Sequence, residues 1–328
     1  MENLRLNYRL KQLIVNFFLS QKMLRKNDLI DIISPGTACT RDELEKIKNY
    51  VKKIGLTPRI FLEKETRISK KLTHEFATIN AKTRFEQLKK SIESKDSKII
   101  WCTSGGYGSA EILPLLQKMK KPKIPKIFIG FSDISVLNTF LIQQWNWQVI
   151  SAPMMIQLAC ETVSKKSEKG ILDLIFGKTK ELKYSLTTGG HQLTGLIVGG
   201  CISVLTNNFG TENQLDWEKK ILFLEDEGED GERLDRYFHQ IITIIKETKK
   251  KPRAVVLGNF LKANPHGTPK AKNIEIAIKK FTEKLAGIAP VFQEKTKCLG
   301  HGKNMLPLLL GAKTEITAEG FLIQKINL

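Results

Sequence analysis

The chain has 328 residues, of which 41% are hydrophobic and 27% charged, and its formal net charge is +19. This length allows two domains with cores of their own, and the composition is typical of a globular protein. No apolar run reaches the roughly 18 residues needed to span a bilayer, which argues against stable membrane insertion.

The strong positive charge would attract anions, so nucleic acid is the first partner to consider. The lysines are spread along the whole chain, however, without an arginine-rich arm, a basic motif interleaved with aromatic residues, or zinc-finger spacing. We therefore expect a lysine-rich solvated surface and no nucleic-acid partner. The positive electrostatic field would also attract a peptide substrate with several carboxylates.

The first 23 residues combine a basic start with a short apolar patch, 13–19. This is the order found in a signal peptide, but the patch contains Asn16 and no small-x-small cleavage site follows it before Lys22. We expect an N-terminal amphipathic extension. The five cysteines show no CxxC spacing, which favours reduced thiols in a cytoplasmic protein over disulfides or a zinc site.

Residues 24–160 alternate apolar runs with amphipathic stretches. Strands are expected at 29–34, 58–62, 98–103 and 127–129, and helices at 41–54, 80–95, 109–118 and 133–143. This alternation predicts an α/β layer with a mostly parallel sheet.

A loosened pattern over 161–190, with one short helical piece near 170–176, predicts a linker. Residues 191–328 are then expected to form a second α/β domain. Its first element, 193–207, reads as a strand, a Gly-Gly turn and the start of a helix. Further strands are expected at 220–226, 253–260, 290–293 and 321–326, and helices at 233–250 and 274–285.

A serine stands at a sharp turn after the strand 127–129, in the sequence Gly130-Phe131-Ser132-Asp133. Such a turn presents the hydroxyl above the sheet edge and aims backbone N–H groups at whatever lies beside it. Ser132 is therefore a candidate nucleophile. A serine nucleophile needs a base, usually a histidine oriented by a carboxylate.

Among the five histidines, His301 stands between two glycines, in a tight loop where the backbone approaches a neighbour closely. The others are His74, His191, His239 and His266. Spacing alone leaves a surface or loop role open for each of the five.

The carboxylate candidate is Glu225, the first acid after the apolar run 221–224. The carboxyl end of a buried strand is where α/β folds place functional groups. The alternative is that Glu225 only begins a solvated acidic loop, 225–232. That loop faintly resembles a calcium loop, but the ligand spacing breaks at Gly228 and the twelfth position lacks a glutamate, so we expect no metal site.

The glycine-rich run 104–109, SGGYGS, lies between a strand and a helix. It lacks the Lys-Ser/Thr of a phosphate-binding P-loop and the full dinucleotide spacing. Its N–H groups can instead form half of an oxyanion hole, with the N–H of Asp133 as the other half.

Five blocks of the chain, in this order, resemble the LD-carboxypeptidases, a family that includes muramoyl-tetrapeptide carboxypeptidases and microcin-immunity hydrolases. The blocks are IIWCTSGGYGSAEILPLL (99–116), GFSDISVL (130–137), GLIVGGCISVL (195–205), ILFLEDEGEDGERLDRYFHQI (221–241) and GHGKNMLPLLLGAK (300–313). The resemblance extends over nearly the whole chain, 24–326, and it is specific because five separate blocks agree.

This resemblance implies a catalytic triad of Ser132, Glu225 and His301, with no metal or organic cofactor. It implies that Gly106 and Asp133 supply the oxyanion-hole N–H groups. The implied fold is an N-terminal α/β nucleophile domain joined to a smaller C-terminal α/β domain, with the site at their interface and usually a homodimer.

Substrate contacts are expected from Ser104, Gly105 and Tyr107. Many relatives carry arginine where this chain has Ser104, which leaves open the contact that such an arginine would make to a substrate carboxylate. The backbone role of the glycines survives this difference.

The expected reaction is cleavage of the L–D peptide bond of the murein tetrapeptide, with release of D-alanine during peptidoglycan recycling. The alternative is an immunity-type hydrolase that cleaves a peptidyl-nucleotide toxin. That branch is expected to stack the base on an aromatic residue, and 161–190 contains Tyr184 but no tryptophan, which favours murein. A third possibility, a binding protein on a retired hydrolase scaffold, is disfavoured by the intact Ser132, Glu225 and His301.

Overall fold

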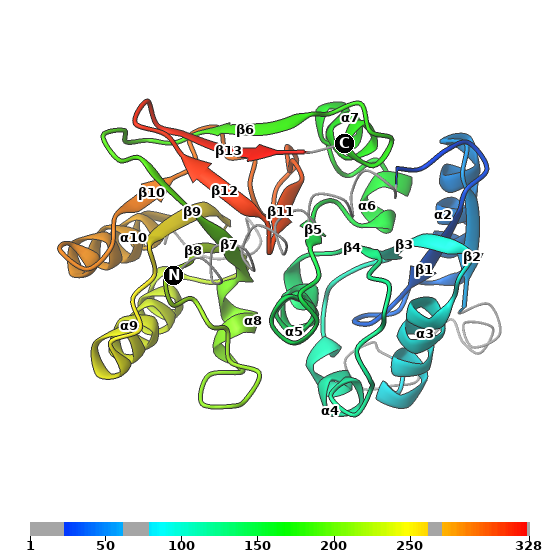
Figure 1. Cartoon of the computed structure of the whole chain (residues 1–328), viewed down its shortest axis with the longest axis horizontal. Helices are drawn as coiled ribbons and strands as arrows, with labels where there is room; N and C mark the ends of the chain where they lie inside the picture. The colour runs from blue at the N-terminus through cyan, green and yellow to red at the C-terminus, as the bar shows by residue number, and fades with distance from the viewer. Residues whose placement is uncertain (1–22, 62–78, 262–270, 327–328) are drawn as a thin grey trace, which may run out of the picture.

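The computed structural model describes residues 23–61, 79–261 and 271–326, and it forms two β-sheets with helices packed around them (Figure 1). Residues 1–22 of the expected extension, His74 and His266 lie outside the described residues. No helix in the described ranges combines the length and the apolar character needed to cross a bilayer.

The first sheet has six strands in the order β11-β5-β4-β3-β1-β2. They are β1 (Leu29–Ile33), β2 (Thr57–Ile60), β3 (Ser97–Cys102), β4 (Ile127–Ile129), β5 (Val149–Ser151) and β11 (Leu308–Leu310). The strands from β2 to β5 are parallel to their neighbours, whereas β11 is antiparallel to β5. The near-complete burial of β1, β3 and β4 explains their continuous apolar runs, since a parallel sheet is covered on both faces.

The helices around this sheet are α2 (Arg41–Lys53), α3 (Ala81–Glu93), α4 (Leu113–Leu116), α5 (Ser135–Trp145), α6 (Met155–Ala159) and α7 (Lys165–Ile175). The helix expected at 109–118 is instead a 3₁₀ turn, Ser109–Ile112, followed by the short α4. Pro114 accounts for this difference, because it lacks the N–H that a continuous helix would bond to Ala110.

The second sheet has seven strands in the order β10-β9-β8-β7-β12-β13-β6. They are β6 (Glu181–Ser185), β7 (Leu193–Cys201), β8 (Ile221–Glu227), β9 (Ala254–Leu261), β10 (Val291–Gln293), β12 (Lys313–Ile316) and β13 (Phe321–Lys325). Strands β7 to β10 are parallel, and β12, β13 and β6 continue the sheet as antiparallel strands.

In the described part of the chain, the helices beside the second sheet are α8 (Ile202–Thr206), α9 (Gly231–Thr248) and α10 (Ala271–Leu285). Asp230 caps the start of helix α9 by accepting the N–H of Arg233, and the helix buries one apolar stripe. The stripe contains the five residues expected from the sequence, namely Leu234, Phe238, Ile241, Ile242 and Ile245. The α/β fold class is confirmed.

Two further segments differ from the sequence-based expectation. The segment 161–190 carries helix α7 and strand β6, and β6 buries Leu182 and Tyr184 in alternation while Lys183 faces outward. Strand β7 also continues through Gly199 to Cys201 rather than turning. A Cβ on Gly199 would lie 1.9 Å from the carbonyl oxygen of Phe223, so the glycine permits close strand contact with β8. The domain boundaries themselves stay predictions.

The C-terminal part of the chain returns to the first sheet. Strand β11 pairs with β5. A buried side chain from the second sheet forms hydrogen bonds with the β11 backbone. The Gln324 side-chain amide accepts the N–H of Leu309 at 2.9 Å and donates to the carbonyl oxygen of Leu309 at 2.7 Å. In Figure 1, β11 accordingly lies between the two halves of the molecule.

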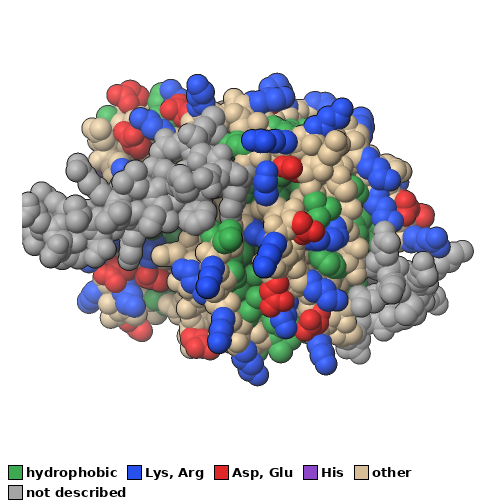
Figure 2. All heavy atoms as spheres, turned by 45° about the vertical axis from the view of Figure 1, so that its right-hand side comes forward, with side chains coloured by type: hydrophobic (Ala, Val, Ile, Leu, Met, Phe, Trp, Pro, Cys, Tyr) green, Lys and Arg blue, Asp and Glu red, His purple; other side chains and the backbone are tan. Residues whose placement is uncertain are grey.

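Lysine and arginine side chains are spread over the face drawn in Figure 2, with acidic and apolar side chains among them.

Candidate active site

Ser132 lies at the turn between β4 and α5, with a left-handed φ of 62°. A non-glycine residue adopts this conformation at a cost of about 1 kcal/mol or more, which packing must offset. The packing is tight, since a Cβ on Gly105 would lie 2.9 Å from the Cβ of Ser132. The turn therefore holds the serine hydroxyl in one place at the edge of the first sheet.

Glu225 comes from the second sheet, near the carboxyl end of β8, and is 1% exposed. The pairing of β8 with β9 is irregular there, since Leu224 pairs with Leu257 while Asp226 pairs with Phe260. The extra residue in β9 forms a bulge, and bulges re-aim the side chains beside them.

His301 lies in the loop between β10 and β11 and is 7% exposed. Gly300 precedes it with a φ of +88°, and a Cβ there would lie 2.6 Å from the Cβ of Glu225. Only glycine suits both that conformation and that contact. The ring of Phe131 packs against the imidazole, with ring centroids 4.7 Å apart.

Ser132, His301 and Glu225 form one hydrogen-bonded chain. The Nε2 atom of His301 lies 3.0 Å from the Ser132 Oγ, and its Nδ1 lies 2.6 Å from the Glu225 Oε2. The backbone N–H of His301 donates to the same Glu225 oxygen at 2.9 Å. With the proton on Nδ1, Nε2 is free to accept the serine proton, which is the arrangement that activates a serine nucleophile.

Burial of the imidazole acts to lower the pKa of His301, but the neighbouring carboxylates outweigh it. The charge of Glu225 and its hydrogen bond contribute most, followed by the charges of Glu227 and Asp226, so the pKa of His301 is raised above its ordinary value. The Glu227 Oε2 lies 3.8 Å from His301 Nε2.

Asp226 is a second buried carboxyl beside Glu225. Burial raises the pKa of Asp226 to about 6. One carboxylate oxygen accepts the N–H of Ser203 at 2.8 Å and the thiol of Cys201 at 3.4 Å. The other has no hydrogen-bond partner within the described part of the chain. Asp226 thus joins β8 to the start of α8.

Asp133 directly follows Ser132, and the turn that carries Gly106 packs against the serine through Gly105. A Cβ on Gly105 would lie 3.4 Å from the backbone nitrogen of Asp133, and Gly106 follows in the same turn and is exposed. The Asp133 carboxylate accepts the N–H of Ser109 at 2.9 Å, and burial raises its pKa. These contacts join the 104–109 turn to the start of α5. The donor role of Gly106 and Asp133 stays a prediction.

The three expected substrate contacts occupy different positions. The Ser104 hydroxyl is half-buried and donates to the carbonyl oxygen of Thr37 at 2.7 Å. Gly105 is buried against Ser132. Tyr107 is 50% exposed, and its N–H donates to the Thr37 hydroxyl at 3.1 Å. The side chain of Tyr107 is therefore the most accessible of the three.

Two polar residues that support the site were not recognised in the sequence. The Asn259 amide donates to the carbonyl oxygens of His301, at 2.6 Å, and Lys297, at 2.9 Å, and so holds the histidine loop. Its only sequence signal is its place at the end of an apolar strand. Fully buried Arg84 donates to the carbonyl oxygens of Pro35 and Gly108 at 2.6 and 2.5 Å. Its signal is an arginine four residues before Leu88, on the apolar face of α3.

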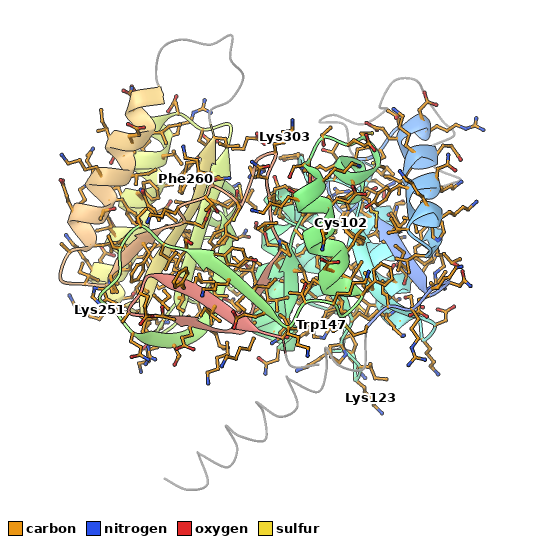
Figure 3. All side chains as sticks on the ribbon, turned by 90° about the horizontal axis from the view of Figure 1, so that it is seen from above. Cys102, Lys123, Trp147, Lys251, Phe260 and Lys303 are labelled. Carbon is orange, nitrogen blue, oxygen red and sulfur yellow. The ribbon has the colours of Figure 1, made fainter. Side chains whose placement is uncertain are left out.

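The remaining described histidines lie elsewhere. The ring of His191 packs edge-on against Phe292, and His239 is exposed on α9. In the part of the chain that the structure describes, no group of three or more His, Cys, Asp or Glu side chains is placed to hold a metal ion. Figure 3 shows Lys303, two residues after His301, between the half that carries Cys102 and the half that carries Phe260.

Two family models match the chain. The LD-carboxypeptidase N-terminal domain matches residues 30–152, and the LD-carboxypeptidase C-terminal domain matches residues 194–316.

Related proteins carry carboxypeptidase names. The chain is 27% identical over 303 residues to a putative carboxypeptidase of Rickettsia conorii, and this alignment covers 89% of this chain and 88% of that protein. It is 28% identical over 243 residues to the murein tetrapeptide carboxypeptidase of Pseudomonas aeruginosa, and this alignment covers 70% of this chain and 76% of that protein.

Solved structures share the fold. An MccF-like protein from Bacillus anthracis matches with a TM-score of 0.76 at 20% identity, covering 93% of this chain and 98% of that one. A muramoyltetrapeptide carboxypeptidase from Oxalobacter formigenes matches with a TM-score of 0.73 at 23% identity, covering 90% and 98%. At such identities the likeness shows the fold alone.

Proposed function

The chain belongs to the LD-carboxypeptidase family, and from this premise we propose that it is a serine carboxypeptidase that releases D-alanine from the murein tetrapeptide. The observation that carries the proposal is the hydrogen-bonded chain from Ser132 through His301 to Glu225. The substrate class is supported by the name of the Pseudomonas aeruginosa relative.

In the first step, Ser132 Oγ attacks the carbonyl carbon between the L-centre of the third residue and D-alanine. His301 Nε2 takes the hydroxyl proton, and Glu225 stabilises the imidazolium that forms and keeps Nδ1 protonated. The N–H groups of Gly106 and Asp133 stabilise the oxyanion, an effect of about 3 kcal/mol per donor in comparable enzymes.

The tetrahedral intermediate then collapses. The C–N bond breaks, and His301 returns its proton to the nitrogen of the departing D-alanine, leaving an ester on Ser132. Water attacks this ester while His301 removes one of its protons, and the same proton then restores the serine hydroxyl. The products are the tripeptide and D-alanine, and the enzyme is unchanged.

We also propose that the protein acts in the cytoplasm as a homodimer. Its five cysteines, all without a disulfide, suit a reducing compartment. Sedimentation analysis of the full chain tests the dimer.

The alternative of a peptidyl-nucleotide hydrolase lacks support from the residue considered for stacking. Tyr184 is 4% exposed, and its hydroxyl donates to the carbonyl oxygen of Pro307. A buried ring held in this way is not available to stack a base.

The first test is to incubate the purified protein with L-Ala-γ-D-Glu-meso-diaminopimelate-D-Ala and to follow D-alanine release by mass spectrometry. We expect Ser132→Ala to lower kcat by about 10⁴-fold or more, because the nucleophile is lost. Ser185→Ala on β6 is the matched control and should behave as wild type.

The same peptide ending in L-alanine tests the stereochemistry of the bond. We expect release from the D-terminated peptide alone. Equal release from both peptides, or full activity of Ser132→Ala, would overturn the proposed reaction. No release by a folded wild-type preparation would remove the murein peptide as substrate.

A further inference from the structure

Glu227 is the last residue of β8, two positions beyond Glu225 and therefore on the same face of the strand. Its Oε2 lies 3.8 Å from His301 Nε2, the nitrogen that faces Ser132 Oγ at 3.0 Å. The Glu227 carboxylate and the serine hydroxyl are therefore at most about 7 Å apart. Glu225 contacts the opposite nitrogen, so the two glutamates cannot share one role.

The two carboxylates also differ in exposure. The side chain of Glu227 is 51% exposed, whereas that of Glu225 is 2% exposed. The backbone of Glu227 is held, because it pairs with Leu261 of β9 and the next N–H, of Gly228, donates to the Leu261 carbonyl oxygen at 2.9 Å. A carboxylate carried by a fixed stretch of backbone thus stands open to solvent near the reacting serine.

No lysine or arginine neutralises this carboxylate within ion-pair distance, as far as residues 23–61, 79–261 and 271–326 are concerned. The next acid of the loop, Glu229, differs in this respect, since it pairs with Arg233 at 3.5 Å. The negative charge of Glu227 is therefore available to a ligand in the site.

A substrate bound at Ser132 would cover part of Glu227 and remove water from it. An uncharged side chain would then leave the carboxylate desolvated without a partner, which is costly. An ammonium group would replace the lost water with a charge-assisted hydrogen bond. The site should therefore discriminate between peptides by the charge of the side chain nearest the cleaved bond.

We propose that Glu227 is a specificity-determining residue that binds an ammonium group on the side chain of the residue supplying the attacked carbonyl. The inference rests on the proposed function and deepens it, because it assigns to Glu227 the recognition of the side chain that precedes the terminal D-residue.

The test compares L-Ala-γ-D-Glu-L-Lys-D-Ala with the same peptide carrying norleucine, which keeps the carbon chain but lacks the ammonium group. We expect wild type to favour the lysine peptide by about tenfold or more in kcat/KM, and Glu227→Gln to lose most of this preference. The loss should appear as a higher KM for the lysine peptide with a similar kcat, because the contact is made in both ground and transition states.

Glu218→Gln is the matched control. Glu218 is also a partly exposed glutamate, 40% exposed at its side chain, but it precedes β8 and so lies at the other end of the same strand. This variant should keep the wild-type preference. In a Ser132→Ala background, calorimetry with the two peptides should give the same preference as a ratio of dissociation constants, independently of chemistry.

The outcomes separate the inference from the proposed function. An equal lysine-to-norleucine ratio in wild type and Glu227→Gln would overturn the inference, because Glu227 would then act only through its charge on His301, which affects both substrates alike. If D-alanine is released from none of the three peptides (lysine, norleucine or diaminopimelate), the proposed function is overturned, and the inference with it.

Discussion

The imidazole of His301 lies among three carboxylates, and this sets its proton affinity. Burial alone would lower the pKa of His301, but Glu225, Glu227 and Asp226 raise it. A base must be neutral to accept the serine proton, so a raised pKa moves the acid limb of the pH–rate profile to higher pH than an ordinary histidine would give.

We expect Glu227→Gln to move this acid limb toward lower pH. Removal of one negative charge near Nε2 destabilises the imidazolium and lowers the pKa of His301, so the neutral base persists at more acidic pH. The measurement is kcat/KM against pH with the norleucine peptide, which reports the free enzyme without the proposed ammonium contact. Glu218→Gln serves as the control, and a limb that moves to higher pH would contradict the electrostatic account.

At the scale of elements, the histidine loop depends on the end of β9. Asn259 donates to two carbonyl oxygens of that loop, and its own N–H donates to Leu299 at 2.8 Å. The bulge in β9 opposite Glu225 places Asn259 there. Strand end and loop thus form one unit that orients His301 toward Glu225.

Asn259→Ala should lower kcat/KM by about 10- to 100-fold, because the His301 loop loses two hydrogen bonds and the imidazole its fixed orientation. Activity and urea unfolding should be measured under the same conditions, at a temperature where every variant is folded. Asn49→Ala, on the exposed face of α2, is the control and should leave both quantities near wild type.

A purely structural role for Asn259 would lower the free energy of unfolding while sparing kcat/KM of the folded enzyme. Unchanged activity in a destabilised Asn259→Ala variant would therefore refute the positioning role.

For the whole molecule, the decisive feature is that β11 leaves the second half of the chain and completes the first sheet. Ser132 comes from one half, and Glu225 and His301 from the other, so the distance between Ser132 and His301 depends on how the halves pack. Helix α5 adds a second junction, since the Ser135 hydroxyl at its start accepts the N–H of Cys201 at 3.1 Å.

Gln324→Leu tests the junction at β11. Leucine keeps most of the volume but leaves the buried N–H and carbonyl of Leu309 without their side-chain partner, which should cost about 2 kcal/mol or more. Gln293→Leu, at an exposed position of β10, is the control. We expect Gln324→Leu to lower the free energy of urea unfolding, with fluorescence and activity lost in a single transition. If activity is lost at a clearly lower urea concentration than fluorescence, the two halves separate while each stays folded.

The sequence by itself determined the local structure and the candidate chemistry. Apolar runs such as 221–224 predicted buried strands, the spacing of apolar residues predicted α9, and the flanking glycines placed His301 in a tight loop, as one candidate base among five histidines. These features can be recognised from the sequence alone because the periodicity of side chains and the residue preferences of turns are local properties. The resemblance to the LD-carboxypeptidases, read from five blocks, added the triad and the two-domain fold.

Only the tertiary structure decided which of these groups meet. Glu225 and His301 are 76 residues apart in the chain, and Ser132 and His301 are 169 apart. No sequence pattern predicted the contacts of Gln324, the return of β11 to the first sheet or the approach of Glu227 to the imidazole. The place of Asn259 at the end of an apolar strand did not reveal its contacts with the His301 loop. The periodicity of a segment indicates which face each of its residues occupies, whereas the contacts made on that face depend on how distant segments pack.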